Sequence, residues 1–358
     1  MADLLVYGSY GFTGSLIVDE ALDRGLDVIV AGRDRNAVEN QAIRQKCDER
    51  VFSLDEPRLV DHALEEVEAV LHCAGPFADT AEPMVEGCLR TGTHYLDITG
   101  EIEVFERLAG YDDEAAEAGV MVLPGVGFDV VPTDCLAAHL AERVPDADRI
   151  ALGFEASGGI SPGTAKTAIR GLGDGGAVRR NGRIEVVPIG IDTRRIDFGR
   201  GERTAMAIPW GDVSTAYHTT GIETVAVYTA VPSWVPRAAR LGKLFGPLAG
   251  SGPVQSLLES LVDARVDGPD ECERRDGRSY VWGEAETADG DRAVSRLVAP
   301  ETYRLTKLTA VEIAERVVGG DAPEGFQTPA GAYGPDLILD IEGVERTDDP
   351  VETVQKSV

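Results

Sequence analysis

The chain has 358 residues and 43% hydrophobic content, which is enough to build two modest domains and excludes a disordered protein. Its 62 acidic against 34 basic residues give a formal charge of −28, and because such a charge repels phosphates, nucleic acid is excluded as a partner. Only five basic residues are lysines, and an acidic, lysine-poor surface is typical of proteins adapted to high salt, where cations screen the self-repulsion.

Residues 1–131 alternate between short β-rich runs and longer amphipathic stretches. The expected strands are residues 4–7, 28–31, 51–54, 69–72, 95–98 and 120–123. The expected helices are residues 14–24, 58–66, 83–91 and 103–118. Repeated β-α units predict an α/β fold, a Rossmann-type doubly wound parallel sheet with helices on both faces.

Three equally spaced glycines follow the first expected strand, in the stretch VYGSYGFTG. Gly8 is suited to a tight turn, Gly11 to a close approach of the backbone to a pyrophosphate, and Gly14 to close packing of helix on strand. The helix that follows presents N–H groups and a partial positive charge to the phosphates. The spacing is GxxGxxG rather than GxGxxG, and its strand-turn-helix context favours a dinucleotide cradle over a plain turn.

The second expected strand ends in AGRD, where an NAD enzyme usually carries an acid for the ribose hydroxyls. An arginine fork at this point, Arg33, is suited to a 2′-phosphate, so NADP(H) is the predicted cofactor. Asp34 follows at once and offers the alternative, a ribose contact with NAD(H). A solvated surface arginine is the other interpretation of Arg33.

The character of the chain changes at Pro132, where a helix-like run is followed by glycines, prolines and alternating strands. The expected strands here are residues 150–156, 184–187, 224–231, 279–286 and 293–298. They predict a second, mixed α/β domain over residues 132–300, for substrate binding or dimerisation. Residues 301–346 are expected to form a helical return that packs on the first domain, and residues 347–358 a flexible tail.

The five cysteines and five histidines are scattered, with no CxxC or HExxH spacing, so the sequence predicts no metal. No run approaches the ~20 apolar residues of a membrane span, and the start of the chain lacks the pattern of a secretory signal. We expect a cytoplasmic protein.

Several motifs in order resemble the saccharopine dehydrogenase-like NADP-binding oxidoreductases, and more closely the branch called trans-acting enoyl reductases. The matching pieces are YGSYGFTG, AGRD, HCAGPF, THYLDITGE, GFDVVPTD, SPGTAKT, PWGD and QTPAGAYGPDLI. The resemblance covers nearly the whole chain. It implies a Rossmann domain followed by a smaller α/β domain, and an NADP(H)-linked oxidoreductase acting on enoyl, polyketide or lipid-like substrates.

The resemblance also implies roles for individual residues. The phosphates would be lined by Gly8, Ser9, Gly11, Phe12, Thr13 and Gly14. Arg33 would hold the 2′-phosphate, and Ala74, Gly75 and Pro76 would pass under the nicotinamide half of the cofactor. No lysine or histidine pair aligns with the acid and base of true saccharopine dehydrogenases.

Three carboxylates are candidates for the substrate side. Asp97 and Glu101, in YLDITGE, come at the carboxyl end of an expected strand, where ligands of open α/β folds bind. Their alternative role is to cap the next helix. Asp129 lies at the end of the first expected domain and has the alternative role of N-cap for the helix that starts near Pro132.

The second expected domain supplies hydroxyls and a proton donor. Ser161 and Thr164, in SPGTAKT, are suited to an anion at a helix start, with Lys166 beside them as a candidate donor. Tyr217 and His218 are candidates to protonate an enolate or alkoxide. The structural alternatives are a surface salt bridge for Lys166 and a β-strand packing pair for Tyr217 and His218.

Two further stretches were weighed. Tyr303 and Lys307 form the YxxxK pair of short-chain dehydrogenases but lie far from the glycine motif, so that assignment is rejected. Residues 232–250 carry three basic residues and no acid among apolar ones, which is the composition of an interfacial membrane helix. A helix at the domain joint or a homodimer contact is the favoured alternative, because prolines and glycines interrupt the pattern.

The sequence therefore predicts an NADP(H)-dependent reductase of an enoyl or carbonyl group in a lipid or polyketide-like molecule. One alternative is a sensor or structural protein that binds NADP(H) but catalyses no reaction. The other is an amino-acid dehydrogenase of the saccharopine type.

Overall fold

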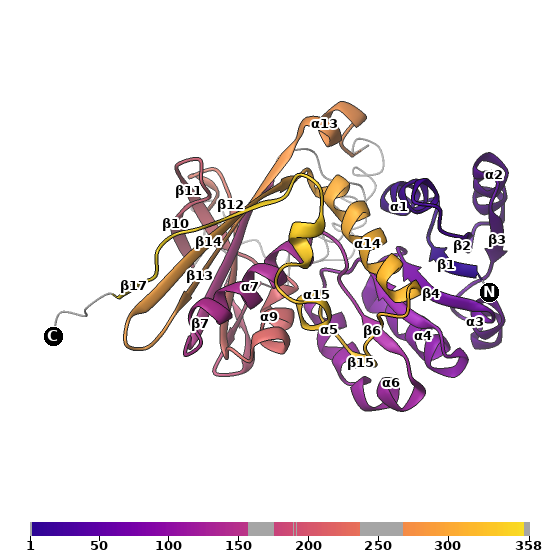
Figure 1. The fold of residues 1–358 in the computed structure, drawn as a ribbon, viewed down its shortest axis with the longest axis horizontal. Coiled ribbons are helices and arrows are strands. Elements are labelled where there is room, and N and C mark those ends of the chain that lie inside the picture. The colour runs from indigo at the N-terminus through magenta and orange to yellow at the C-terminus, as the bar shows by residue number, and fades with distance from the viewer. Residues whose placement is uncertain (1, 157–174, 189, 191, 237–267, 354–358) are drawn as a thin grey trace. The chain divides into compact units, whose positions relative to one another are not determined.

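The computed structural model describes residues 2–156, 175–188, 190, 192–236 and 268–353. The contacts divide the chain into two compact units, one of residues 1–131 and 303–334 and the other of residues 132–302 and 335–358. The first unit is therefore completed by a segment that returns from the carboxyl-terminal part of the chain (Figure 1).

The first unit is built on a seven-stranded parallel sheet with the strand order β15-β6-β5-β4-β1-β2-β3. The strands are β1 (Ala2–Tyr7), β2 (Val28–Gly32), β3 (Asp48–Val51), β4 (Val67–His72), β5 (His94–Asp97), β6 (Met121–Leu123) and β15 (Gly325–Phe326). The helices are α1 (Phe12–Asp23), α2 (Arg35–Gln45), α3 (Pro57–Leu64), α4 (Phe77–Thr91), α5 (Ile102–Ala109), α6 (Asp112–Ala118), α14 (Thr302–Val318) and α15 (Pro329–Tyr333). The order 3-2-1-4-5-6 within this sheet is that of a dinucleotide-binding fold, which confirms the predicted fold class.

The apolar strands explain why this sheet is buried. Every residue of β2 is buried, and the side chains of Leu5 and Tyr7 on β1 join a core cluster with Val60 of α3 and Met84 of α4.

The returning helix α14 is attached to the rest of the first unit by an ion pair. Lys307 of α14 forms an ion pair of 2.7 Å with Glu20 of α1, so the returning helix is fixed to the helix that follows the glycine loop.

Several elements differ from the expectation, and three in the first unit have a reason in their own sequence. The helix α2 was not expected, because only Val38, Gln41 and Ala42 of its eleven residues are buried and it has almost no apolar face. The third strand lies at residues 48–51 rather than 51–54, since it is a charged strand at the sheet edge. The expected helix 103–118 is two helices that end at Gly110 and Gly119.

The second unit contains a mixed sheet whose main path is β10-β11-β12-β7-β13-β14-β16. The strands are β7 (Arg149–Ala156), β8 (Gly176–Arg180), β9 (Arg183–Val187), β10 (Thr193–Asp197), β11 (Glu202–Ala207), β12 (Thr224–Ala230), β13 (Arg278–Glu286), β14 (Asp291–Pro300), β16 (Glu345–Asp348) and β17 (Glu352–Thr353). The helical elements are α7 (Val131–Arg143), α9 (Asp212–Thr220), α13 (Glu271–Asp276) and the 3-10 turn η2 (Leu337–Asp340). The hairpin of β13 and β14 is antiparallel, as the ADGD turn predicts.

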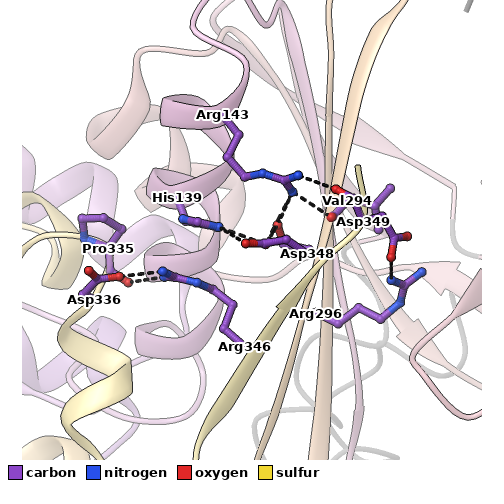
Figure 2. Close-up of polar contacts among 10 residues, drawn as sticks. His139, Arg143, Val294, Arg296, Pro335, Asp336, Arg346, Asp348 and Asp349 are labelled. Carbon is purple, nitrogen blue, oxygen red and sulfur yellow. Dashed lines mark hydrogen bonds and ion pairs between the residues drawn. The ribbon is translucent and has the colours of Figure 1, made fainter. Parts of the chain in front are cut away.

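The carboxyl-terminal segment is attached to this sheet by polar contacts. Figure 2 shows His139 and Arg143 of α7 turned toward Asp348 of β16. His139 Nε2 lies 3.0 Å from the Asp348 carboxylate, and Ser295 of β14 donates to the same carboxylate at 2.6 Å. Residues 347–358 were expected as a flexible tail, but residues 347–348 end β16 and residues 352–353 form β17, and both strands pair with β14. Their polar composition hid this role, because ion pairs and strand pairing hold them rather than apolar burial.

Replacement of Asp348 by Asn should destabilise the second unit, because His139, Arg143 and Ser295 lose a charged acceptor. We expect about 1 kcal/mol, less than is usual for charged hydrogen bonds, because 39% of this side chain is exposed. Tryptophan fluorescence during urea unfolding reports on this unit, since Trp210, Trp234 and Trp282 all lie in it.

The matched control is Asp336→Asn, whose carboxylate bonds Arg346 at 2.7 Å but is 73% exposed. We expect this control to unfold within about 0.3 kcal/mol of the unchanged protein. Equal effects of the two variants would contradict the role of Asp348.

Candidate functional site

The strand order of the first unit reverses at β1, which has β4 on one side and β2 on the other. The chain leaves the carboxyl end of β1 at Gly8 and that of β4 at Cys73. In open α/β sheets, ligands bind beyond the carboxyl ends of the strands at such a switch point. The glycine motif and the HCAGPF motif therefore meet where the fold places its ligand.

The loops after β1 and β4 approach so closely that side chains are excluded. A Cβ on Gly8 would lie 2.8 Å from Ala74 Cβ, and Gly8 has the left-handed φ of +80°. A Cβ on Gly14 would collide with the carbonyl oxygen of Gly8. The amide of Gly11 donates to that same carbonyl at 3.0 Å, which closes the turn. Gly8 and Gly14 thus have the turn and close-packing roles that the motif predicts.

The helix α1 begins at this turn without a side-chain cap. Gly11 is its N-cap, no acid lies in its first turn, and its first backbone bond runs from Ser15 N–H to Gly11 O. An N-terminus of this kind presents amide N–H groups and a partial positive charge. The ring of Phe12 packs edge-on against Tyr303, with ring centroids 5.1 Å apart, so its side chain is used in packing against α14. Thr13 stays partly exposed.

Ser9 differs from its expected role. Its side chain is fully buried, and its hydroxyl donates to Gln41 Oε1 at 2.7 Å, while Gln41 Nε2 donates back to Ser9 O at 3.0 Å. The amide of Ser9 is bonded to Ala31 O. Ser9 therefore anchors the glycine loop to α2 and β2, and its side chain faces the protein interior.

Beyond β2, the two polar residues of AGRD are used differently. The Asp34 carboxylate accepts from Ala37 N–H at 3.1 Å and so caps α2. Arg33 is exposed, and among the described residues it has no hydrogen bond or ion pair. The end of β2 thus presents an exposed guanidinium beside a carboxylate of which one oxygen caps α2.

The loop Ala74-Gly75-Pro76 is held from below. The Thr80 hydroxyl lies 2.8 Å from Ala74 O and 3.0 Å from Pro76 O, to which it donates. It therefore accepts from His72 Nε2, 2.9 Å away. His72 is fully buried among the rings of Tyr7, Phe77 and Tyr95, and no described residue bonds its Nδ1. Burial lowers the pKa of His72 to about 3, so it is neutral at physiological pH.

Asp97 and Glu101 hold loops rather than face outward. Asp97 is fully buried and accepts from Tyr95 Oη at 2.7 Å and from the amides of Thr99 and Gly125 at 2.9 Å each. Burial raises its pKa to about 6. Glu101 accepts from the amides of Phe77 and Ala78 at 3.1 and 2.9 Å. Glu101 is the N-cap residue of α5, but its side chain bonds the first turn of α4, which begins at Phe77 instead of near Pro83.

Asp129 is the third candidate carboxylate, and it lies in the loop after β6. A Cβ on Gly100 would be 2.8 Å from Asp129 Oδ2, so this side chain is pressed against the loop after β5. Burial raises the pKa of Asp129 to about 7. A carboxyl group with such a pKa at the carboxyl edge of the sheet is suited to general acid–base chemistry.

The candidate donors of the second unit are only partly described. Tyr217 and His218 lie on α9, a helix rather than the strand considered as their alternative. The Arg179 guanidinium lies 4.3 Å from the centre of the Tyr217 ring, a cation–π contact, and His218 is exposed. Ser161, Thr164 and Lys166 lie outside the described residues.

The structure describes the Tyr303 and Lys307 pair in full and residues 232–250 in part. Tyr303 packs on Phe12 and Lys307 pairs with Glu20, so the YxxxK pair holds α14 to α1. Of residues 232–250, only 232–236 are described, and Trp234 there is 66% exposed. None of the helices in the described ranges combines the length and the apolar character needed to cross a membrane.

Sequence reasoning missed Gln41, Thr80 and His72 as supports of the site. His72 is the first residue of the HCAGPF motif, but nothing in the neighbouring sequence shows that its ring is buried. Thr80 and Gln41 lie on helices, and their partners are 6 and 32 residues away in sequence, so no short pattern reveals them.

Comparison with known families identifies the first unit. Residues 4–123 match the family described as the saccharopine dehydrogenase NADP binding domain. This match covers the expected cofactor domain and confirms the resemblance seen in the motifs.

Curated relatives give the same assignment at low identity. A saccharopine dehydrogenase-like oxidoreductase of Mus musculus is 28% identical over 205 residues, which are 49% of this chain and 47% of that protein. A trans-acting enoyl reductase of Mycobacterium ulcerans is 26% identical over 152 residues, 40% of this chain and 36% of that protein. The matched region spans about half the length of the first of these relatives.

Solved structures share the fold over nearly the whole chain. Saccharopine dehydrogenase (L-Glu forming) from Saccharomyces cerevisiae has a TM-score of 0.66 at 14% identity and covers 98% of this chain and 100% of its own. The homospermidine synthase of Legionella pneumophila, solved in complex with NAD, has a TM-score of 0.58 at 11% identity, with coverage of 94% and 88%.

The buried His72 predicts a specific loss of stability in acid. Its pKa is about 3 in the folded chain against an ordinary 6.5, so between these values only the unfolded chain takes up the proton. Stability is therefore lost as pH falls from 6.5 toward 3, by up to ~1.4 kcal/mol per pH unit from this residue.

The variant His72→Gln keeps a donor for Thr80 but does not titrate. The difference in unfolding free energy between it and the unchanged protein, measured by circular dichroism at successive pH values, should shift in favour of the variant below pH 6.5. Parallel stability curves would show that His72 takes up its proton in the folded state.

Proposed function

We propose, from the match of residues 4–123 to the saccharopine dehydrogenase NADP binding domain, that this chain is an NADP(H)-dependent oxidoreductase. One observation carries the choice of cofactor: at the end of β2, Arg33 is exposed without a described partner while Asp34 is committed to capping α2. A guanidinium at this position favours a 2′-phosphate, and the N-cap bond of Asp34 uses one of the two carboxylate oxygens that a ribose contact of NAD(H) would need.

The site's residues have a distinct task at each part of the cofactor. The uncapped start of α1 and the turn of Gly8 and Gly11 receive the pyrophosphate. The Ala74-Gly75-Pro76 loop, held by Thr80, supports the nicotinamide half, and the bound nicotinamide supplies the hydride. Asp129, at the same edge of the sheet, is the residue we assign to proton transfer.

The substrate we propose is an enoyl or carbonyl group in a lipid or polyketide-like molecule. The support is the likeness to the trans-acting enoyl reductase of Mycobacterium ulcerans, at 26% identity over 40% of this chain. Reduction of either group needs a hydride and a proton, and a carboxyl group with a pKa of about 7 is half protonated at neutral pH.

Loss of the Arg33 guanidinium tests the cofactor preference. Arg33→Ala should weaken NADPH binding by about 1.5–3 kcal/mol, roughly 10- to 150-fold in Kd, because a charged hydrogen bond to phosphate is lost. NADH, which lacks the 2′-phosphate, should bind within about twofold of the unchanged protein. The measurement is nicotinamide fluorescence at equilibrium in molar KCl.

Arg35→Ala is the matched control. Arg35 is two residues away, is 70% exposed in its side chain and pairs with Glu39 on α2, so it reports the general effect of removing a positive charge. Equal losses of NADPH affinity in the two variants would refute a specific 2′-phosphate contact, and no binding of either nucleotide to the unchanged protein would refute the proposed function.

Asp129→Asn tests the proton-transfer role. With a pKa of about 7, the Asp129 carboxyl is protonated below pH 7 and loses its proton above it. If Asp129 is the general acid, the rate of NADPH oxidation should fall as the pH rises through 7. The Asn variant should lose about 10²-fold in rate together with this pH dependence.

The rate is measured with a panel of enoyl thioesters and ketones as acceptors, and unchanged NADPH affinity in the variant serves as the control for an intact cradle. A variant that keeps the full rate would remove Asp129 from the mechanism. Failure of the unchanged protein to oxidise NADPH with any acceptor would favour a non-catalytic NADP(H)-binding protein.

A further inference from the structure

The glycine loop carries one large exposed side chain, Tyr10, which lies between Gly8 and Gly11 in the sequence. Its ring lies over Gly32, the last residue of β2: a Cβ on Gly32 would be 2.5 Å from Tyr10 Cε1. The residue is nevertheless 38% exposed. The absence of a side chain at position 32 is thus what allows Tyr10 to lie at the end of β2.

The hydroxyl of Tyr10 is placed beside Arg33. It accepts a long hydrogen bond of 3.4 Å from the amide of Asp34, the residue that follows Arg33. A phenol that accepts one hydrogen bond still has its own proton to donate, and no described residue accepts it. Tyr10 and Arg33 also both act on the pKa of Tyr7, which agrees with their being neighbours. Burial is the main cause that raises this pKa, Tyr10 raises it further and Arg33 lowers it.

We propose that Tyr10 is the second half of the 2′-phosphate site and a determinant of cofactor specificity. Its hydroxyl donates a hydrogen bond to the phosphate that Arg33 neutralises, so a neutral donor and a cation act on the same group. The inference rests on the proposed binding of NADP(H), and it assigns a role that the glycine motif alone does not require of this position.

The same placement works against NAD(H). In NAD enzymes a carboxylate near the end of this strand accepts from the ribose hydroxyls. Here the space over Gly32 is filled by the Tyr10 ring, and the Asp34 amide is held by Tyr10 while its carboxylate caps α2. Tyr10 therefore supplies a contact for the phosphate and occupies the region that a ribose-binding acid would use.

Three variants separate these effects. Tyr10→Phe removes only the hydroxyl and keeps the ring on Gly32. Tyr10→Ala removes both. Gly32→Ala leaves Tyr10 intact but displaces its ring, and the φ of Gly32 lies outside the left-handed region, so alanine is sterically allowed there apart from this contact.

We measure Kd for NADPH and NADH with each variant by nicotinamide fluorescence in molar KCl. Tyr10→Phe should weaken NADPH about fivefold, as expected for loss of one hydrogen bond, and leave NADH within about twofold. Tyr10→Ala and Gly32→Ala should both lower the preference for NADPH over NADH at least as much. Unchanged thermal unfolding shows that each variant is folded.

The outcomes distinguish the inference from the proposed function. If Arg33→Ala reduces the NADPH preference but all three variants leave it unchanged, the inference is overturned and the proposed function stands. Equal weakening of NADPH and NADH would also overturn it, because Tyr10 would then serve the cradle as a whole. If the unchanged protein binds neither nucleotide, the proposed function fails and the inference fails with it.

Discussion

The close approach of the loops after β1 and β4 is the constraint on which the site depends. Gly8 and Ala74 leave no room for a Cβ between them, and Gly14 brings the start of α1 against the Gly8 carbonyl. Backbone groups therefore form the surface at the switch point, where amides can approach a phosphate directly. The surrounding side chains support this arrangement: Ser9 and Gln41 fix the first loop, and Thr80 with the buried His72 fixes the second.

The acidic side chains at the carboxyl edge of the first sheet are hydrogen-bonded to the backbone, whereas Arg33 is not paired with a described residue. Asp34, Asp97 and Glu101 accept hydrogen bonds from backbone amides and so complete helix starts and loops. Arg33, at the end of β2, is an exposed cation with no hydrogen bond or ion pair among the described residues. Hydrogen bonding does not remove the charge of these acids, so the attraction of an anion to the end of β2 rests on the Arg33 guanidinium itself.

The sequence was sufficient for the Rossmann sheet and the glycine cradle, because apolar strands and a strand-turn-helix motif are local signals. It was insufficient for α2, whose exposed polar surface lacks an apolar period, and for α4, whose start depends on the distant Glu101. The inward orientation of Ser9 depends on its hydrogen bond with Gln41, 32 residues away. Tyr217 lies on the helix α9, which the STAYHTTG stretch alone did not reveal. Contacts of this kind arise only when the tertiary structure forms.

The helix that carries the cradle is itself held by the returning segment of the chain. Glu20 of α1 bonds Lys307, and Arg24 of α1 contacts Glu312 and Glu315 at 3.1 and 2.7 Å, so one face of α1 is fixed to α14 by charged pairs. At molar salt the Debye length is about 3 Å, so the long-range repulsion of an acidic surface is screened while pairs in direct contact persist. These contacts are partly buried, with side-chain exposures between 14% and 35%. Lys307, one of only five lysines in the chain, therefore helps to position the helix whose amino end we propose as the phosphate site.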